Sequence, residues 1–176
     1  MGGTVLFQDA LHARLELIKP SSQDITALLA KHPIRFSKGI EALITQLQTR
    51  GIHVFLVSGG FRQMIDPIAI KLGIPSHRVY ANTLLFDDVG AYAGFDSSEF
   101  TSRDGGKPAV ITRLKELHRY KTVIMVGDGA TDMQARPPAD AFIGYGGVIE
   151  RENIRQGADW YVKDFNEMMS VFAELK

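Results

Sequence analysis

The sequence predicts an α/β protein with a Rossmann-like parallel sheet, and three observations carry this prediction. Apolar, strand-like segments alternate with segments whose apolar residues recur at helical spacing. Two glycine-rich signals, at residues 58–60 and 127–132, each follow a strand-like run. A short alternating stretch with a glycine turn, at about residues 82–96, is typical of an inserted β-hairpin. Strands that are joined through helices pair in parallel, which predicts the fold class.

The N-terminal part of the chain is predicted to be helical. Residues 4–18 place four apolar side chains on one helical face. Ser21 and its polar neighbours offer caps for a second, short helix, and Ser37 offers a cap for a third helix that ends before Gly51. The run HVFLVSGG at residues 53–60 then predicts a fully buried strand that ends in a glycine turn.

The rest of the chain repeats this alternation. After the third helix and its strand we expect helices over 61–72, 107–118 and 150–156, strands near 78–81, 122–129, 141–147 and 160–162, and a closing helix. Residues 1–32 are predicted to form a small helical piece. Residues 33–176 are predicted to form one α/β domain that carries the hairpin.

The composition narrows the function classes. Of 176 residues, 45% are hydrophobic and 23% charged, which are ordinary values for a globular domain. Twenty basic residues balance twenty acidic ones, so the charge favours neither a nucleic-acid nor a membrane-surface partner. Because there is no cysteine, disulfides, thiolate zinc sites and a cysteine nucleophile are excluded. The first residues lack the basic start and the apolar run of a signal peptide, and no apolar stretch is long enough to span a membrane. We therefore expect a cytoplasmic protein.

Ser58, Gly59 and Gly60 form the first candidate binding site. Glycines let backbone N–H groups turn toward an anion, while the serine hydroxyl and a following helix N-terminus add donors. A plain strand-to-helix turn explains the same three residues equally well, so this signal is weak by itself.

The second candidate site follows the strand-like run TVIMV. Carboxylates at the carboxyl end of a strand suit Mg²⁺, which prefers oxygen ligands. Helix capping by Asp128 or Thr131 is the alternative, but two acids and a threonine are more than one cap needs. We therefore expect Asp128 and Asp132 to be functional.

Two cations complete the set of candidates. Lys107 follows two glycines at the start of a predicted helix, where its ammonium can neutralise phosphate charge in a transition state. Arg14 lies on the first predicted helix and can pair with a substrate carboxylate. The alternative for both is a solvated surface residue, which is the usual state of an isolated lysine.

These motifs together resemble a known family. The order SGG, then a lysine after two glycines, then GDGATD resembles the second, third and fourth motifs of haloacid dehalogenase-type phosphatases. The chain is similar over essentially its whole length to phosphoserine phosphatases of animal type, in the segments VFLVSGGF, ANTLLF, AGFD, GGKPAVI, GDGATDM, PPADAFIGYGG and WYV.

The resemblance implies hydrolysis of O-phospho-L-serine to L-serine and phosphate, the last step of serine biosynthesis, with Mg²⁺ and an aspartyl-phosphate intermediate. It implies catalytic roles for Lys107 and Asp128, and metal binding by Asp128 and Asp132. The substrate-binding residues that it implies are Met1, Gly2, Arg14, Ser58, Gly59, Gly60, Lys107 and Thr131. It also implies a homodimer, and it makes residues 1–32 the remainder of a helical cap domain.

One motif of the family is missing from these 176 residues. The family begins with a strand that ends in Asp-x-Asp-x-Thr or Val, whose first aspartate is the nucleophile and whose second is the acid and base. The sequence contains no Asp-x-Asp, and the pair Asp87-Asp88 has the wrong spacing. We therefore expect an N-terminally truncated chain that lacks the central first strand of its sheet, leaves two strand edges unpaired, and is inactive or nearly so.

Two other interpretations remain. The first is a non-catalytic phosphate-binding or interaction protein, which uses a free sheet edge to associate with a full-length phosphatase. An unrelated nucleotide-binding domain fits poorly, because neither G-x-G-x-x-G nor G-x-x-x-x-G-K-[ST] occurs.

Overall fold

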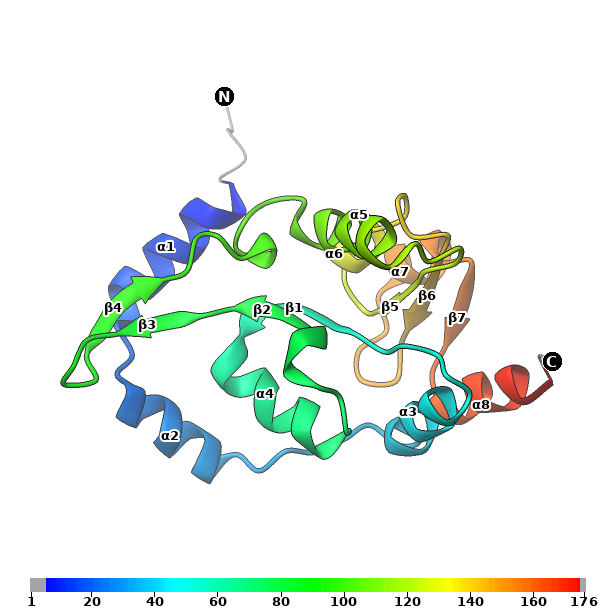
Figure 1. Cartoon of the computed structure of the whole chain (residues 1–176), viewed down its shortest axis with the longest axis horizontal. Helices are drawn as coiled ribbons and strands as arrows, with labels where there is room; N and C mark the ends of the chain where they lie inside the picture. Colours follow the sequence, from blue (N-terminus) through cyan, green and yellow to red (C-terminus); the bar gives the residue numbers. More distant parts are fainter. Residues whose placement is uncertain (1–5, 175–176) are drawn as a thin grey trace. The chain divides into compact units, whose positions relative to one another are not determined.

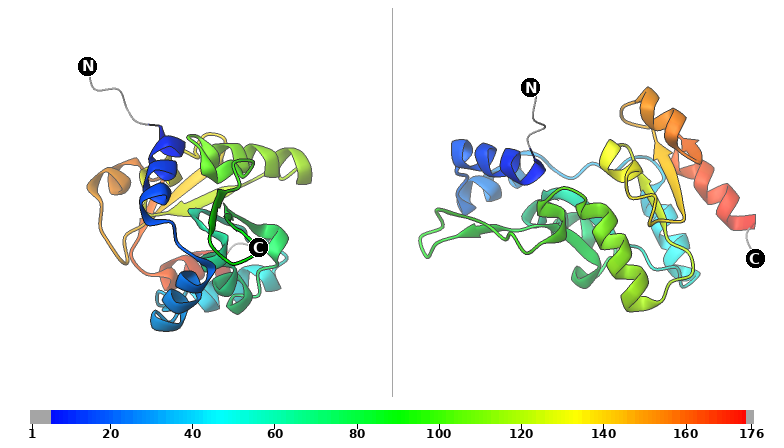
Figure 2. Two further views of the ribbon diagram at one scale, coloured as in Figure 1. Left: turned by 90° about the vertical axis from the view of Figure 1, so that its left-hand side faces the viewer. Right: turned by 90° about the horizontal axis from the view of Figure 1, so that it is seen from above.

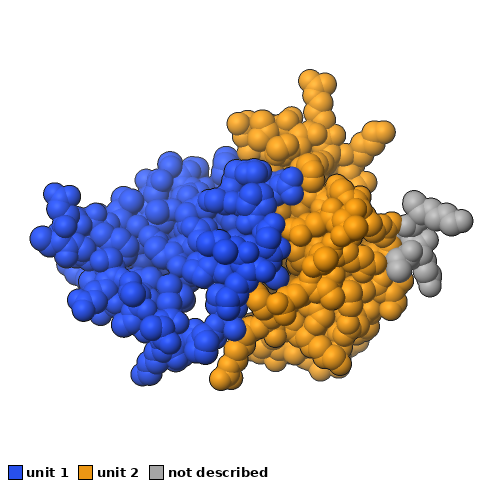
Figure 3. Space-filling view, turned by 60° about the horizontal axis from the view of Figure 1, so that its bottom comes forward, with its two compact units in different colours: residues 1–34, 55–106 blue, residues 35–54, 107–176 orange. Residues whose placement is uncertain are grey.

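The structure is a computed structural model that describes residues 6–174. These residues divide into two compact units, which Figure 3 shows in different colours. Unit 1 comprises residues 1–34 and 55–106, and unit 2 comprises residues 35–54 and 107–176. The parallel strands belong to two separate sheets, one in each unit. The predicted α/β class with parallel strands is confirmed, whereas the predicted boundary of the cap at residue 32 stays a prediction.

Unit 1 contains a two-stranded parallel sheet and an antiparallel hairpin. Strand β1 (Leu56–Phe61) pairs in parallel with β2 (Val79–Asn82), and α4 (Arg62–Lys71) connects them through a short 3₁₀ turn. The register shifts between Val57 and Phe61, so the Ser58-Gly59-Gly60 segment lies in an irregular part of β1. Such an irregularity turns backbone N–H and C=O groups away from the neighbouring strand, with which they would otherwise form hydrogen bonds.

The hairpin and the first two helices complete unit 1 (Figure 1). The predicted hairpin is confirmed as β3 (Leu84–Phe86) and β4 (Tyr92–Phe95), whose connection contains Gly90 at φ 84°. The predicted helices are confirmed as α1 (Phe7–Ile18) and α2 (Ser22–Lys31). Their apolar faces meet the hairpin in one core, built around the side chains of Leu15, Ile25 and Leu84.

Unit 2 has a three-stranded parallel sheet in the order β5-β6-β7. Its elements are α3 (Ile40–Thr49), α5 (Gly106–His118), β5 (Ile124–Gly127), α6 (Ala130–Met133), β6 (Ala141–Tyr145), α7 (Glu152–Gly157), β7 (Trp160–Val162) and α8 (Phe165–Glu174). Neighbouring residues of β6 face opposite sides, as the period of a strand requires. Phe142 packs in a core with residues of α5 and α7, and Ile143 packs in another with residues of α3 and α8. Helices α3 and α8 lie side by side in Figure 2 and contact each other.

Two local predictions are wrong. The third helix begins at Ile40 with Gly39 as its N-cap residue, at φ 85°, instead of at the predicted cap Ser37. The backbone carbonyl of Ser37 accepts a turn hydrogen bond from the Ile40 N–H, 3.2 Å away, so Ser37 belongs to the turn before the helix. Strand β1 is only partly buried at every position, because within residues 6–174 it pairs with β2 alone and its second edge has no strand.

Strand β5 of unit 2 also lies at an edge of its sheet. Among the described residues β5 pairs only with β6. Its apolar side chains Ile124 and Val126 are 42% and 37% exposed, although both are β-branched residues typical of buried strands. Within residues 6–174, each unit therefore contains a parallel strand with an unpaired edge. No helix within the described range is long and apolar enough to cross a membrane.

Candidate functional site

The Ser58-Gly59-Gly60 segment is the irregular part of β1 in unit 1 and is called the turn below. The Gly60 N–H donates to the Ser58 Oγ over 3.0 Å, so the serine hydroxyl is held against this backbone group. A Cβ added to Gly59 would lie 3.5 Å from the ring of Phe7 in α1, which shows that α1 begins directly against this turn. The segment precedes α4, whose first N–H groups add positive potential at its N-terminus. The predicted helix after this segment is present as α4, whereas the predicted end of the strand before the glycines is wrong, because residues 58–60 belong to β1 itself.

Asn82 was missed by the sequence analysis. It stands at the carboxyl end of β2, is fully buried, and its side-chain amide donates to the Gly59 carbonyl over 2.8 Å. A polar residue at the end of an apolar strand, beside the strand that carries the glycine turn, was the available signal. The carboxyl ends of neighbouring parallel strands lie at the same edge of a sheet.

The second candidate group lies in unit 2, where Lys107 and Asp132 meet. Lys107, at the start of α5, forms an ion pair through its Nζ with Oδ1 of Asp132. The side chains are only 16% and 8% exposed, respectively. The second carboxylate oxygen, Oδ2, accepts the Gly129 N–H over 3.0 Å and so caps α6. Capping in this loop is therefore performed by Asp132, and neither Asp128 nor Thr131 provides it.

Gly127 allows this arrangement because it has no side chain. A Cβ at that position would lie 2.2 Å from Cγ of Asp132, far inside van der Waals contact. The last residue of β5 must therefore be glycine for the carboxylate to lie against the strand end. The strand, the glycine and the acid form one packed unit.

Asp128 has a partner that the sequence analysis missed. Arg151, at the residue before α7, donates through Nη1 to the Asp128 carbonyl over 2.6 Å and also contacts its carboxylate Oδ2. The Asp128 side chain is 51% exposed, so the pair lies at the surface. No sequence spacing links residues 128 and 151, because they come together only through the β6 connection.

The remaining candidates are more isolated. Arg14 in α1 and Thr131 in α6 are exposed, and neither forms a hydrogen bond or ion pair through its side chain within residues 6–174. Met1 and Gly2 lie outside the described residues. Ser58, Gly59, Gly60 and Arg14 belong to unit 1, while Lys107, Asp128, Thr131 and Asp132 belong to unit 2.

The carboxylates in unit 2 do not form a complete Mg²⁺ site. In the described part of the chain no three side chains of His, Cys, Asp or Glu gather as metal ligands would. One oxygen of each candidate carboxylate is already paired with a cation, Arg151 or Lys107. A hard cation would have to replace these partners, so the residues present do not match the donor set that Mg²⁺ needs.

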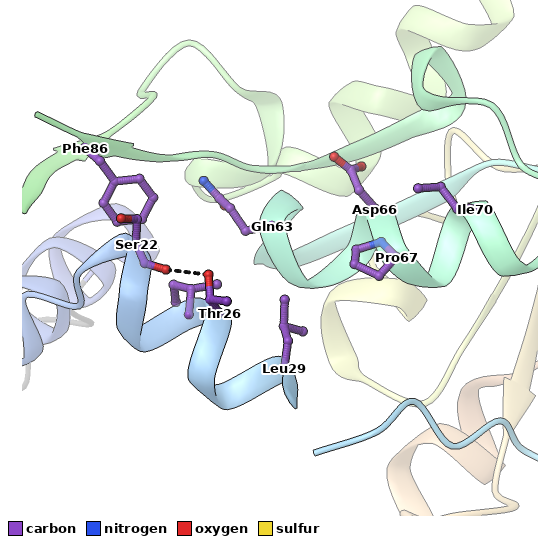
Figure 4. A pocket seen from close by; sticks show the side chains of 9 residues that line it. Ser22, Thr26, Leu29, Gln63, Asp66, Pro67, Ile70 and Phe86 are labelled. Atoms are coloured by element: carbon purple, nitrogen blue, oxygen red, sulfur yellow. Dashed lines mark hydrogen bonds between the residues drawn. The ribbon is translucent and has the colours of Figure 1, made fainter. Parts of the chain in front are cut away.

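A pocket of about 390 Å³ occurs elsewhere in unit 1 (Figure 4). It lies between α2 and α4 and contains none of the predicted site residues. Its walls are mostly apolar, and its hydroxyl and amide groups are largely used within the protein: Thr26 donates to the Ser22 carbonyl, and Gln63 bonds both backbone groups of Leu84. Nothing in its lining points to phosphate.

Comparison with known proteins agrees with the fold and the motifs. The family model for haloacid dehalogenase-like hydrolases matches residues 2–140. Among solved structures, a phosphoserine phosphohydrolase-like protein from Francisella tularensis superposes with a TM-score of 0.81 at 27% identity, over 95% of this chain and 77% of that one. These two matches define the class of protein as a haloacid dehalogenase-like hydrolase.

Curated relatives define the class more closely. The chain is 50% identical to phosphoserine phosphatase from Bos taurus over 174 residues, which is 99% of this chain and 77% of that protein. It is 48% identical to phosphoserine phosphatase from Homo sapiens over the same shares of the two chains. The chain therefore belongs to the phosphoserine phosphatase family of the haloacid dehalogenase superfamily.

Proposed function

We propose that this chain recognises O-phospho-L-serine and its product phosphate, and that it serves the phosphoserine phosphatase reaction of serine biosynthesis. The observation that carries the proposal is the 50% identity to a phosphoserine phosphatase over 99% of the chain. The Ser58-Gly59-Gly60 turn supports it, because the Gly60 N–H donates to the Ser58 Oγ and so holds the hydroxyl in place, while the hydroxyl hydrogen can still be donated to an anion. Hydroxyl and backbone N–H groups beside a helix N-terminus are typical phosphate ligands.

Each candidate residue then has a proposed role. By resemblance to the family, the turn binds the phosphoryl oxygens and Lys107 neutralises their negative charge. Arg14 pairs with the substrate carboxylate, for which its exposed guanidinium is free. Thr131 contacts the substrate, as do Met1 and Gly2 by resemblance to the family.

Hydrolysis needs a group that these 176 residues lack. The family's reaction passes through a phosphoryl group on an aspartate, and the sequence has no Asp-x-Asp motif to provide it. We therefore propose that this polypeptide binds phosphate and phosphoserine but releases little or no phosphate by itself. Mg²⁺ dependence through Asp128 and Asp132 stays a prediction from the resemblance, and no step of the proposed function uses the metal.

The test measures turnover and binding together. Phosphate release from O-phospho-L-serine is followed with Mg²⁺ and then with a chelator, and phosphoserine binding is followed by calorimetry. Lys107→Ala is compared with Lys115→Ala, since both lysines lie in α5 and both pair with an aspartate. We expect binding that Lys107→Ala weakens and Lys115→Ala leaves unchanged, without turnover.

Two results would contradict this proposal. Chelator-sensitive phosphate release that Lys107→Ala abolishes would mean that another group attacks phosphorus. Failure of the unaltered chain to bind both phosphoserine and phosphate would mean that family membership has not preserved ligand recognition here.

A second candidate function is association with a full-length phosphatase chain of the same family. The edge of β5 that has no partner strand among residues 6–174, together with exposed Ile124 and Val126, favours it, because an open edge can accept an added strand. A homodimer and a cytoplasmic location belong to the same set of proposals. Light scattering of the mixed chains tests the association. Val126→Lys should abolish a complex formed through β5, whereas Val148→Lys, at a residue 73% exposed outside the strands, should not.

A further inference from the structure

We infer that Asn82 is a positioning residue that aims the phosphate-binding turn, and that Thr101 holds Asn82 in the orientation this requires. The inference rests on the proposed function, because it takes Ser58-Gly59-Gly60 as the anion-binding turn. Neither Asn82 nor Thr101 was among the residues that the motifs indicated. Both belong to unit 1, as does the turn.

The geometry couples Asn82 to the donor side of the turn. The side-chain amide of Asn82 donates to the Gly59 carbonyl over 2.8 Å. A peptide unit is planar and trans, so the Gly59 carbonyl and the Gly60 N–H point in opposite directions from the same peptide bond. Holding the carbonyl on the Asn82 side therefore directs the Gly60 N–H to the other side, where it meets the Ser58 Oγ at 3.0 Å.

The glycines make such a holding contact necessary. A peptide between two glycines can rotate into either orientation at little steric cost, because neither residue has a Cβ. The shift of register between Val57 and Phe61 also removes this segment from the regular ladder with β2. A side-chain hydrogen bond from β2 replaces the ladder bond that the segment lacks.

The orientation of the Asn82 amide follows from chemistry. The Gly59 carbonyl can only accept, so the NH₂ group of Asn82 must face it. The amide oxygen then faces Thr101, whose hydroxyl donates to it over 2.8 Å. Asn82 is 0% exposed and Thr101 4% exposed, so water does not compete for either contact. The chain Thr101–Asn82–Gly59 is a buried relay of hydrogen bonds that ends at the turn.

The cost of burying these groups supports a positioning role. A fully buried amide brings no benefit to stability over an apolar side chain of similar size, unless its hydrogen bonds are needed. Ser102, the next residue after Thr101, is the matched control. It is 2% exposed and its hydroxyl donates to the Glu99 carbonyl over 2.8 Å, but it has no hydrogen bond to the turn.

The experiment compares Asn82→Asp, Thr101→Val and Ser102→Ala in the full 176-residue chain. Hydrogen exchange of the Gly60 amide is measured by NMR without ligand, and phosphate and O-phospho-L-serine are titrated by calorimetry. Asn82→Asp removes the donor and places an acceptor against the Gly59 carbonyl. We expect it to speed Gly60 exchange and to weaken phosphate binding by about tenfold, the equivalent of one lost hydrogen bond. Thr101→Val should act in the same direction, and Ser102→Ala should change neither quantity.

The outcomes separate this inference from the proposed function. Unchanged Gly60 exchange and unchanged affinity in Asn82→Asp would overturn the inference. Equal effects of Ser102→Ala would also overturn it, since the cause would then be general destabilisation. If Gly60 exchange responds but the unaltered chain binds neither ligand, the positioning role stands and the proposed function fails. If Asn82→Asp does not fold, Thr101→Val decides by the same two measurements.

Discussion

Replacing Lys107 by methionine is the sharpest test of how unit 2 is held together. The substitution keeps the length of the side chain but removes the ammonium that pairs with Asp132. The carboxylate is 8% exposed, so its charge would be left in a site that water barely reaches. Breaking a buried ion pair in this way typically lowers the free energy of unfolding by about 3–5 kcal/mol. Because Lys107 is partly exposed, we expect a loss of about 3 kcal/mol.

A double-mutant cycle isolates the interaction energy between Lys107 and Asp132 from the effects of each substitution on other contacts. Asp132→Asn keeps an oxygen that can accept the Gly129 N–H, so we expect it to cost about 1 kcal/mol. The double variant Lys107→Met/Asp132→Asn should cost less than the sum of the single changes, with a coupling energy of about 2 kcal/mol. Lys115→Met is the matched control, because Lys115 lies in the same helix in a pair that is 29% and 40% exposed. We expect it to cost below about 1 kcal/mol.

Urea unfolding followed by the fluorescence of Trp160 measures these differences. Trp160 is the single tryptophan and lies in β7 of unit 2, so the signal reports on the unit that contains the ion pair. If Lys107→Met unfolds at the same urea concentration as Lys115→Met, or if the effects of Lys107→Met and Asp132→Asn are additive, the ion pair does not stabilise the fold.

Three further predictions concern local features of unit 2. Gly39→Ala should lower the free energy of unfolding more than Gly51→Ala. Both glycines have a positive φ, which costs an alanine about 1–2 kcal/mol, but only a Cβ at Gly39 would contact Asn166, at 3.1 Å. Equal losses in urea unfolding would contradict this steric argument. Phe142→Ala should cost about 3–5 kcal/mol in the same measurement, because Phe142 is 0% exposed in its core, and a loss under about 1 kcal/mol would mean that the sheet collapses into the cavity. Hydrogen bonds from Lys115 and a backbone N–H hold the pKa of Asp140 below its ordinary value of 3.8, so its stabilising contribution is present above that pH and is lost as the pH falls through the lower folded pKa. The difference in urea midpoint between the unaltered chain and Asp140→Asn should therefore shrink on acidification from pH 7, and a difference that does not depend on pH would contradict this assignment.

Much of the secondary structure could be predicted from local patterns. The apolar spacing in residues 4–18 predicted α1, the polar residues around Ser21 predicted the cap of α2, and the alternation around Gly90 predicted the hairpin. In α2 the predicted cap is present in full, since Ser21 and Asp24 bond each other's backbone N–H groups. These features depend on interactions between residues that are close in the sequence, so a short stretch of sequence is enough to predict them.

For the candidate site, the sequence predicted the motif residues but not the residues that they contact. The positions of Ser58-Gly59-Gly60 and of Asp128 and Asp132 after strands follow from the sequence, because the apolar runs before them are clear. The partners of these groups do not follow. Arg151 is paired with Asp128 across 23 residues, and Asn82 reaches Gly59 across 23 residues as well.

The sequence by itself determined the family, the order of helices and strands, and the places where polar groups follow strands. The tertiary structure decided which of those groups are buried, which cations neutralise the carboxylates, and that β1 and β5 belong to separate sheets. The physical reason is that hydrogen bonds and ion pairs need only proximity in space, which parallel pairing creates between residues far apart in the chain. Burial and strand pairing likewise depend on neighbours in space, which the sequence around a residue does not reveal.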